Sequence, residues 1–153
     1  NGSMTGWTVN SSNSGVPNNI QLDGTNITGI LDLTGFINGM SGEISITGAS
    51  LMTEILFPVS AGIITKFIIT GSGINVPGKM DFDNLSFDSG IIMDVSANGM
   101  NQAAVDEVLS KAVAVFPGSG TGELDVSTNT APSGAGAADA ATLSGNGYAV
   151  TTD

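Results

Sequence analysis

Residues 122–153 read GELDVSTNTAPSGAGAADAATLSGNGYAVTTD, and the fold prediction starts from this stretch. It holds two short strand patterns, Leu124-Asp-Val126 and Tyr148-Ala-Val150, whose first residues lie 24 positions apart. Between them are a loop rich in Pro and Gly and an Ala-rich segment long enough for two helical turns. A strand, a loop and a helix in such a length form one structural unit, and repetition of a unit along a chain is a primary signal of architecture.

The apolar-x-apolar strand pattern recurs in two interleaved series. The first series begins at six residues separated by 24, 23, 26, 31 and 24 positions: Ile20, Ile44, Phe67, Met93, Leu124 and Tyr148. The second series is displaced by about half a step, with separations of 24, 24 and 25 positions: Trp7, Leu31, Ile55 and Met80. Side chains alternate along a strand, so each unit has an inward apolar pair that a single turn of chain cannot bury. Stacked turns bury these pairs in one continuous core.

These spacings predict one domain with a β-rich fold that becomes α/β at its C-terminal end. We expect a short parallel solenoid of roughly 24-residue coils. Two strands per coil are expected over residues 5–100, and strand-plus-helix coils with a C-terminal cap over residues 101–153. Residues 1–4 are interpreted as an expression-tag remnant. The alternative is an antiparallel β-sandwich, because Asn38-Gly39 and Asn98-Gly99 are typical of hairpin turns.

Two helices are predicted on the back of the last coils. Residues 101–115 carry apolar side chains at helical spacing, with Asn101 as a plausible N-cap and Lys111 toward the negative end. Phe116-Pro117-Gly118 ends this helix. A shorter helix is expected from about Gly136 to Leu143, with Ser133 or Gly134 near its start.

The segments that end the predicted strands carry a pattern known from other proteins. Three of them match L-x-L-x-x-N and resemble leucine-rich repeats: Met93-Asp-Val-Ser-Ala-Asn98, Leu124-Asp-Val-Ser-Thr-Asn129 and Tyr148-Ala-Val-Thr-Thr-Asp153. More narrowly, residues 101–153 are similar, in the spacing APSGAG…ATL…GY.VTT, to a C-terminal segment common in structural and tail-associated proteins of bacteriophages. This resemblance implies a capsid decoration protein or a tail- or fibre-associated protein, located in the virion.

The amino-acid composition limits the partners and the kinds of active site that the chain can have. The chain has fourteen acidic residues, three lysines and neither Arg nor His, which gives a net charge of −11. Such a chain is repelled by phosphate backbones and anionic bilayers, so we expect no nucleic-acid partner and no membrane partner. Without His and Cys, the usual nucleophilic triads and zinc sites are excluded. We therefore expect no enzyme activity and no cofactor, although two carboxylates alone could hydrolyse a glycan. Only 5% of residues are aromatic, which favours a core of Ile, Leu, Val and Met.

Two groups of polar residues are candidate sites. Asp81, Asp83 and Asp88 form the densest acidic group and could bind calcium through oxygen ligands, or could simply be a solvated acidic face. A second group should line one outward strand face, where it could bind a glycan, a protein or ice. The residues that flank this group are too irregular to favour ice binding. Its members are Asp23, Thr47, Thr70, Asp94, Ser96, Asp125, Ser127 and Thr151. Plain β-propensity of Thr and Ser is the alternative explanation of this second group.

Three functions follow from these observations. The leading prediction is a non-enzymatic virion structural protein that contacts a viral coat or tail protein and could also form homo-oligomers. The alternative is a module of a phage tail or bacterial surface that binds a glycan or cell-surface receptor, and that would be secreted or displayed on the cell. The third is a glycan hydrolase that uses the aspartates.

Overall fold

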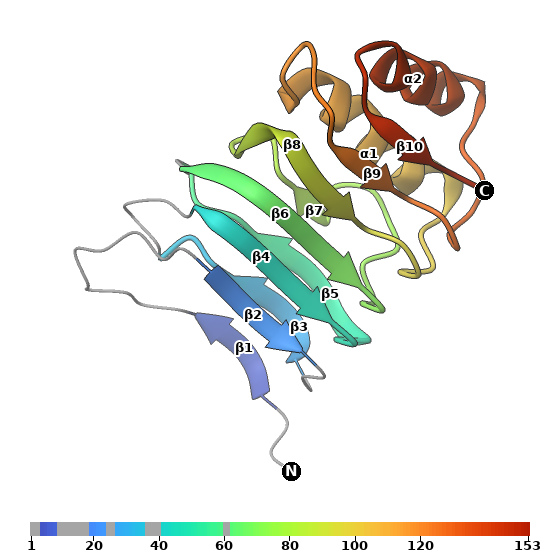
Figure 1. Ribbon diagram of the computed structural model, residues 1–153. Coiled ribbons are helices and arrows are strands. Elements are labelled where there is room, and N and C mark those ends of the chain that lie inside the picture. Colours follow the sequence, from blue (N-terminus) through green and yellow to red (C-terminus); the bar gives the residue numbers. More distant parts are fainter. Residues whose placement is uncertain (1–3, 9–18, 24–26, 36–40, 60–61) are drawn as a thin grey trace.

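The computed structural model of the chain describes residues 4–8, 19–23, 27–35, 41–59 and 62–153 (Figure 1). The described part contains short strands and two helices: β1 (Met4–Thr8), β2 (Asn19–Asp23), β3 (Ile27–Asp32), β4 (Gly42–Thr47), β5 (Leu51–Leu56), β6 (Ile63–Thr70), β7 (Met80–Asp81), β8 (Ser86–Asp94), α1 (Gln102–Val115), β9 (Glu123–Asp125), α2 (Gly134–Gly145) and β10 (Ala149–Thr151). The first strand already begins at Met4, one of the residues that were interpreted as a tag.

The strands form two sheets, and every described strand pair is parallel. The four-stranded sheet has the order β1-β3-β5-β7, and the six-stranded sheet has the order β10-β9-β8-β6-β4-β2. From β1 to β8 the chain alternates between the two sheets, and after β8 it stays with the six-stranded sheet through β9 and β10. The antiparallel sandwich is thus wrong, and Asn98-Gly99 does not turn a hairpin. Asn38-Gly39 lies outside the described residues.

Most of the predicted strand alignment is present as strand register. In the six-stranded sheet the aligned residues are Ile20, Ile44, Phe67, Met93 and Leu124. In the four-stranded sheet they are Trp7, Leu31, Ile55 and Met80. The last alignment is wrong by two residues, because Leu124 pairs with Val150 and not with Tyr148.

The predicted fold class is wrong. The chain has a mixed α/β fold with two sheets of parallel strands and two helices, and its short strands are not arranged as a leucine-rich-repeat-like solenoid. A solenoid requires coils of matching shape. Here the strands run from two residues in β7 to nine in β8, and the register shifts within four of the strand pairs. The four-stranded sheet ends at β7. Further along the chain, α1 connects β8 to β9, and α2 connects β9 to β10.

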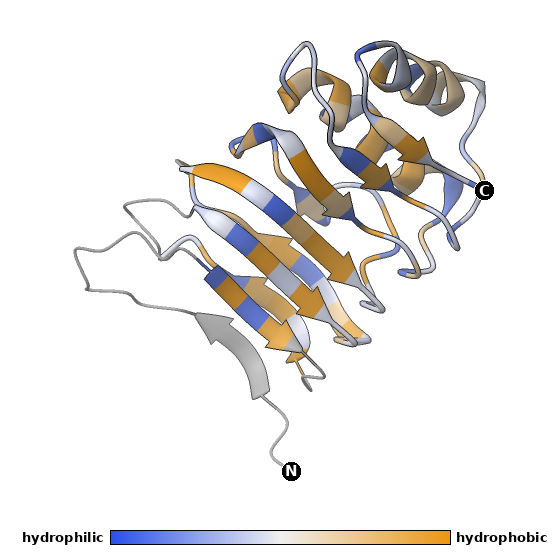
Figure 2. Ribbon diagram, viewed as in Figure 1, coloured by the Kyte–Doolittle hydropathy of each residue, from blue (hydrophilic) through white to orange (hydrophobic). Residues whose placement is uncertain are grey.

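The core lies between the two sheets and continues under the helices. Figure 2 shows apolar and polar bands alternating along the strands of the six-stranded sheet, as expected when one face is buried. Ile, Leu, Val and Met fill much of the core, as predicted. A row of aromatic rings, with centroids 5.1 to 6.0 Å apart, also runs through it: Phe57, Phe67, Phe82, Phe87, Phe116 and Tyr148. The aromatic side chains that the structure describes are thus concentrated in one continuous row.

Both helices begin at the predicted caps. The Asn101 side chain accepts a hydrogen bond from Ala104 N at 2.9 Å, and Ser133 Oγ accepts one from Ala135 N at 3.2 Å. The second helix is longer than expected and runs from Gly134 to Gly145. The helices pack together at the end of the molecule that holds β9 and β10 (Figure 1). In the described part of the chain, neither helix is long and apolar enough to span a bilayer.

Candidate functional site

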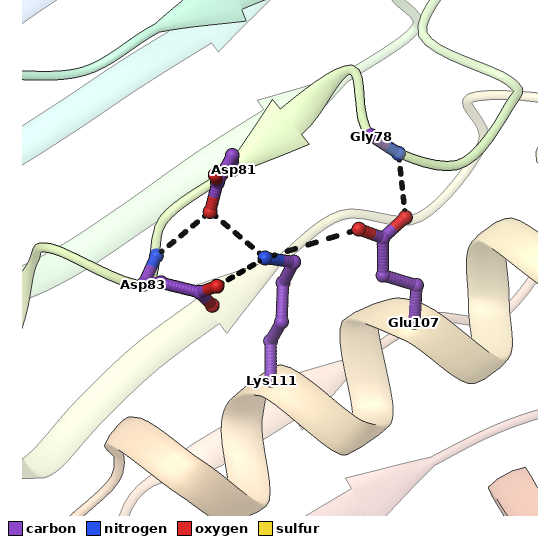
Figure 3. A network of polar contacts seen from close by, with 5 residues as sticks. All are labelled: Gly78, Asp81, Asp83, Glu107 and Lys111. Atoms are coloured by element: carbon purple, nitrogen blue, oxygen red, sulfur yellow. Dashed lines mark hydrogen bonds and ion pairs between the residues drawn. The ribbon is translucent and has the colours of Figure 1, made fainter.

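The strongest cluster of charged side chains joins α1 to the chain around β7. Lys111 Nζ lies 2.8 Å from Asp81 Oδ1, 2.6 Å from Asp83 Oδ2 and 3.8 Å from Glu107 Oε1 (Figure 3). Glu107 Oε2 in turn accepts a hydrogen bond from Gly78 N at 2.6 Å. The lysine side chain is only 13% exposed, whereas both aspartates are more than half exposed. This Lys111 network fastens one face of α1 to the segment 78–83.

The network also shifts the pKa of Asp81 and that of Lys111. The hydrogen bond from Lys111, together with one from Asp83 N, lowers the pKa of Asp81 below its usual value. Burial alone would lower the pKa of Lys111, but the hydrogen bonds to Asp81 and Asp83 outweigh burial and raise the pKa. A lysine with a raised pKa stays protonated and does not act as a nucleophile at neutral pH.

The structure separates the three aspartates that were predicted to bind calcium. Asp81 and Asp83 do lie together, but the cation between them is the Lys111 ammonium. Asp88 Oδ1 accepts a hydrogen bond from Gly90 N at 2.8 Å. Burial raises the pKa of Tyr148, and the negative charge of Asp88 raises it further. Within the described ranges, no three acidic, His or Cys side chains are grouped so as to hold a metal ion. The predicted calcium site is therefore not formed by these three residues.

The predicted polar strand face lies on the outer side of the six-stranded sheet. Its strand members fall into two rows, and only Thr151 departs from the alignment that the strand spacing predicts. Asp94, Asp125 and Thr151 are in register with one another, so Thr151 aligns with Asp125 and not with Ser127. Thr47 pairs with Asp23 on one side and with Thr70 on the other, and the Asp23 side chain lies outside the described residues. Ser96 and Ser127 follow the ends of their strands.

Two carboxylates of this face, those of Asp94 and Asp125, accept hydrogen bonds from the backbone. Asp94 Oδ1 accepts a hydrogen bond from Ser96 N at 2.9 Å, and Asp125 Oδ1 accepts one from Ser127 N at 2.8 Å. Such Asx turns redirect the chain at a strand end. The residue aligned with Asp94 in β6 is the apolar Ile68, which interrupts the polar row. The row therefore combines turn-forming aspartates with an aliphatic side chain.

Two asparagines next to this face were noted only as part of a motif. Asn98 Oδ1 accepts hydrogen bonds from Ser72 N and Ser72 Oγ, both at 2.8 Å, and Asn98 Nδ2 donates to Ile69 O at 2.6 Å and Val95 O at 2.9 Å. Asn129 Oδ1 accepts hydrogen bonds from Asn98 N at 3.1 Å and Met100 N at 3.0 Å. These amides link neighbouring strand ends and are satisfied inside the fold.

Sequence reasoning missed a set of exposed aliphatic side chains on the outer face of the four-stranded sheet. Ile30, Leu51 and Leu56 are 43%, 58% and 37% exposed. Each is adjacent in sequence to a buried partner: Leu31, Met52 and Ile55. Because neighbouring strand residues point to opposite faces, an apolar pair in a strand places one member outside. That pairing was the signal available in the sequence.

All positively charged side chains of the chain are already engaged. Lys66 Nζ lies 2.8 Å from Glu43 Oε1, and Lys79 Nζ lies 3.1 Å from Glu54 Oε2. With Lys111 in its own network, no lysine is left, and the chain has three basic residues against fourteen acidic ones. The uncompensated side-chain charge on the molecule is therefore entirely negative.

No protein family, curated protein or solved structure matches this chain.

Proposed function

We propose that the protein is a non-enzymatic structural component of a bacteriophage virion, a capsid decoration or tail- or fibre-associated protein that acts through protein–protein contacts. The contact role is supported by the partners of the polar side chains and by the exposure of aliphatic ones. Among the described side chains, the candidate carboxylates and the two asparagines are bound to Lys111 or to backbone groups, while aliphatic side chains are exposed on a sheet face. Exposed aliphatic groups on a sheet are typical of a contact surface.

The arrangement of the aspartates argues against glycan hydrolysis. A hydrolase needs one carboxylic acid with a raised pKa beside a second, ionised carboxylate. Asp81 has a lowered pKa and, like Asp83, is bound to a protonated lysine. Asp94 and Asp125 accept hydrogen bonds from Ser96 N and Ser127 N. None of these four residues has the environment of a general acid.

The virion assignment has a separate basis. It rests on the similarity of residues 101–153 to the C-terminal segment of phage structural and tail-associated proteins. The expected partner is accordingly a viral coat or tail protein, and the expected location is the virion. The net charge of −11 is consistent with a role outside the packaged nucleic acid, because phosphate backbones repel it.

Quantitative mass spectrometry of gradient-purified phage particles from the source strain tests this assignment. We expect peptides of the chain to co-purify with coat and tail proteins at a fixed copy number per particle. Particles from a strain in which the gene is deleted serve as the control. Absence of the protein from intact particles, with abundance only in the unassembled fraction, would contradict the proposal.

A second candidate function is supported by the register of Asp94, Asp125 and Thr151. Three polar side chains aligned across adjacent strands could hold a glycan or a cell-surface receptor. A glycan array with the purified protein tests this function. The variant Asp125→Asn keeps the Asx-turn acceptor but removes the charge, so a glycan bound by this row should lose about tenfold in affinity. Absence of binding to every glycan by the wild-type protein would count against a glycan ligand.

A further inference from the structure

We propose that the outer face of the four-stranded sheet, formed by Ile30, Leu51 and Leu56 with Asp32 and Asp81, is the surface through which the protein docks. Its partner is a protein surface that carries Lys and Arg side chains around an apolar centre. This inference rests on the proposed function as a contact protein and names the surface and the chemistry of the partner.

Strand register places the apolar and acidic side chains of this face next to each other. Leu56 of β5 is aligned with Asp32 of β3 on one side and with Asp81 of β7 on the other. Ile30 is aligned with Glu54, and Leu51 with Thr28. Each exposed aliphatic side chain therefore has a polar or acidic neighbour on the adjacent strand, where side chains of aligned residues lie close together.

The aliphatic side chains supply the centre of a contact. All three are substantially exposed although they lie in β-strands, where Thr or a charged residue would suit a solvated face. Contact surfaces between proteins have an apolar core and a polar rim. Asp32, Asp81 and Asp83 form such a rim, and the two latter residues remain more than half exposed despite their ion pairs.

The charge of this face selects a basic partner over a second copy. Five carboxylates lie on or beside it, at residues 32, 54, 81, 83 and 107, against the two lysines Lys79 and Lys111. Both lysines are already paired. Two copies placed face to face would bring like charges together, which is unfavourable, whereas Lys and Arg side chains on another protein would complement the rim.

The outer face of the six-stranded sheet provides a matched control position. Ile92 is 43% exposed, as Ile30 is, but it is aligned with Lys66 on one side and Glu123 on the other. It thus lies beside a lysine that is already paired with Glu43, whereas Leu56 lies between two aspartates. A substitution at Ile92 changes apolar exposure to a similar extent on the face that is not proposed to dock.

The test measures rebinding of purified protein to phage particles from the gene-deletion strain. Leu51→Ser combined with Leu56→Ser should weaken rebinding at least about tenfold, and Ile92→Ser should change it less than about twofold. Rebinding of the wild type should also weaken as salt rises from about 0.05 to 0.3 M, because complementary charges are screened. Circular dichroism verifies that all variants are folded.

Photo-crosslinking identifies the partner surface in the same particles. A photoreactive residue at position 56 should crosslink to a coat or tail peptide with neighbouring Lys or Arg, and one at position 92 should not. Equal rebinding by the double variant and the wild type, or crosslinks from position 92 alone, overturns the docking face while leaving the virion role intact. Failure of the wild type to rebind at all overturns both proposals.

Discussion

At the scale of single residues, the glycines before β9 show where the backbone leaves no room. A Cβ on Gly122 would meet the backbone oxygen and nitrogen of Ile91, whereas a Cβ on Gly118 would meet no atom within 4 Å. The sequence GSGTG of residues 118–122 does not indicate which of its glycines touches a neighbouring strand. That difference arises only when β8 and β9 are brought together.

Gly122→Ala should destabilise the protein by about 1–3 kcal/mol, because backbone atoms of β8 must move to admit the methyl group. Gly118→Ala is the matched control and should change stability by less than about 1 kcal/mol. Urea unfolding followed by circular dichroism measures both. Equal midpoints for the two variants would show that β8 and β9 are not packed this closely.

Asn98 is a second single residue on which the packing of neighbouring strand ends depends, because its buried amide bonds to groups of other segments. Asn98→Ala would leave Ser72 N and the carbonyl group of Ile69 without their side-chain partner, at a cost of about 3 kcal/mol, whereas the carbonyl group of Val95 would keep its hydrogen bond from Asn129 Nδ2. Asn84→Ala, at an exposed loop position, should stay within about 0.5 kcal/mol of the wild type. Thermal unfolding of the two variants compares them directly. Similar melting temperatures would contradict the bonded role of Asn98.

At the scale of elements, sequence reasoning predicted most of the register between strands, but it failed for the contact between α1 and β7. Alternation of side chains predicted the alignment of Ile44 with Phe67, because a buried face tolerates no slip by one residue. The same alternation misplaced Tyr148, because Tyr148 and Val150 are both apolar and either could be aligned with Leu124. Tyr148 precedes the strand, its N–H bonds to Leu143 O, and its ring packs on Phe116.

The contact between α1 and β7 could not be predicted, because Lys111 meets Asp81 across 30 residues of sequence. The same limit explains the error in fold class. Spacing of strand patterns predicts which residues align, but it does not say whether successive turns have matching shapes. In this chain the turn lengths and strand lengths vary too much for a solenoid.

Lys111→Met should weaken the attachment of α1 while retaining the apolar stem of the side chain. We expect a loss of about 0.5–1 kcal/mol, the range of surface ion pairs, since both aspartates are largely solvated. Lys66→Met, which removes the separate pair with Glu43, is the control for loss of one surface lysine.

The pH dependence of this loss follows from the pKa shifts. The pKa of Asp81 in the folded protein is lowered from 3.8, so its stabilisation is present above about pH 4 and is lost as pH falls through the folded-state value. The pKa of Lys111 is raised from 10.5, so its stabilisation is lost only as pH rises above that value. The stability difference between wild type and Lys111→Met should be constant from about pH 5 to 9 and shrink at lower pH. A difference that persists unchanged at about pH 2 would contradict this ion pair.

At the scale of the whole molecule, the fold combines an apolar core with a negatively charged surface. Two sheets of parallel strands enclose an aliphatic and aromatic core, and Asp94, Asn98 and Asp125 hydrogen-bond to backbone groups at the strand ends. The surface has an excess of negative charge, exposed Ser and Thr side chains and a few exposed aliphatic side chains. The candidate calcium site was predicted from three aspartates close in sequence, but the sequence could not reveal that a lysine from α1 would lie between Asp81 and Asp83.

Cryo-electron microscopy of purified particles tests the central claim most directly. We predict that density for the protein lies on the coat or tail, with Leu51 and Leu56 covered by a surface that presents Lys and Arg to Asp32 and Asp81. Particles that lack this density, or that hold the protein with the outer face of its four-stranded sheet open to solvent, would contradict the account.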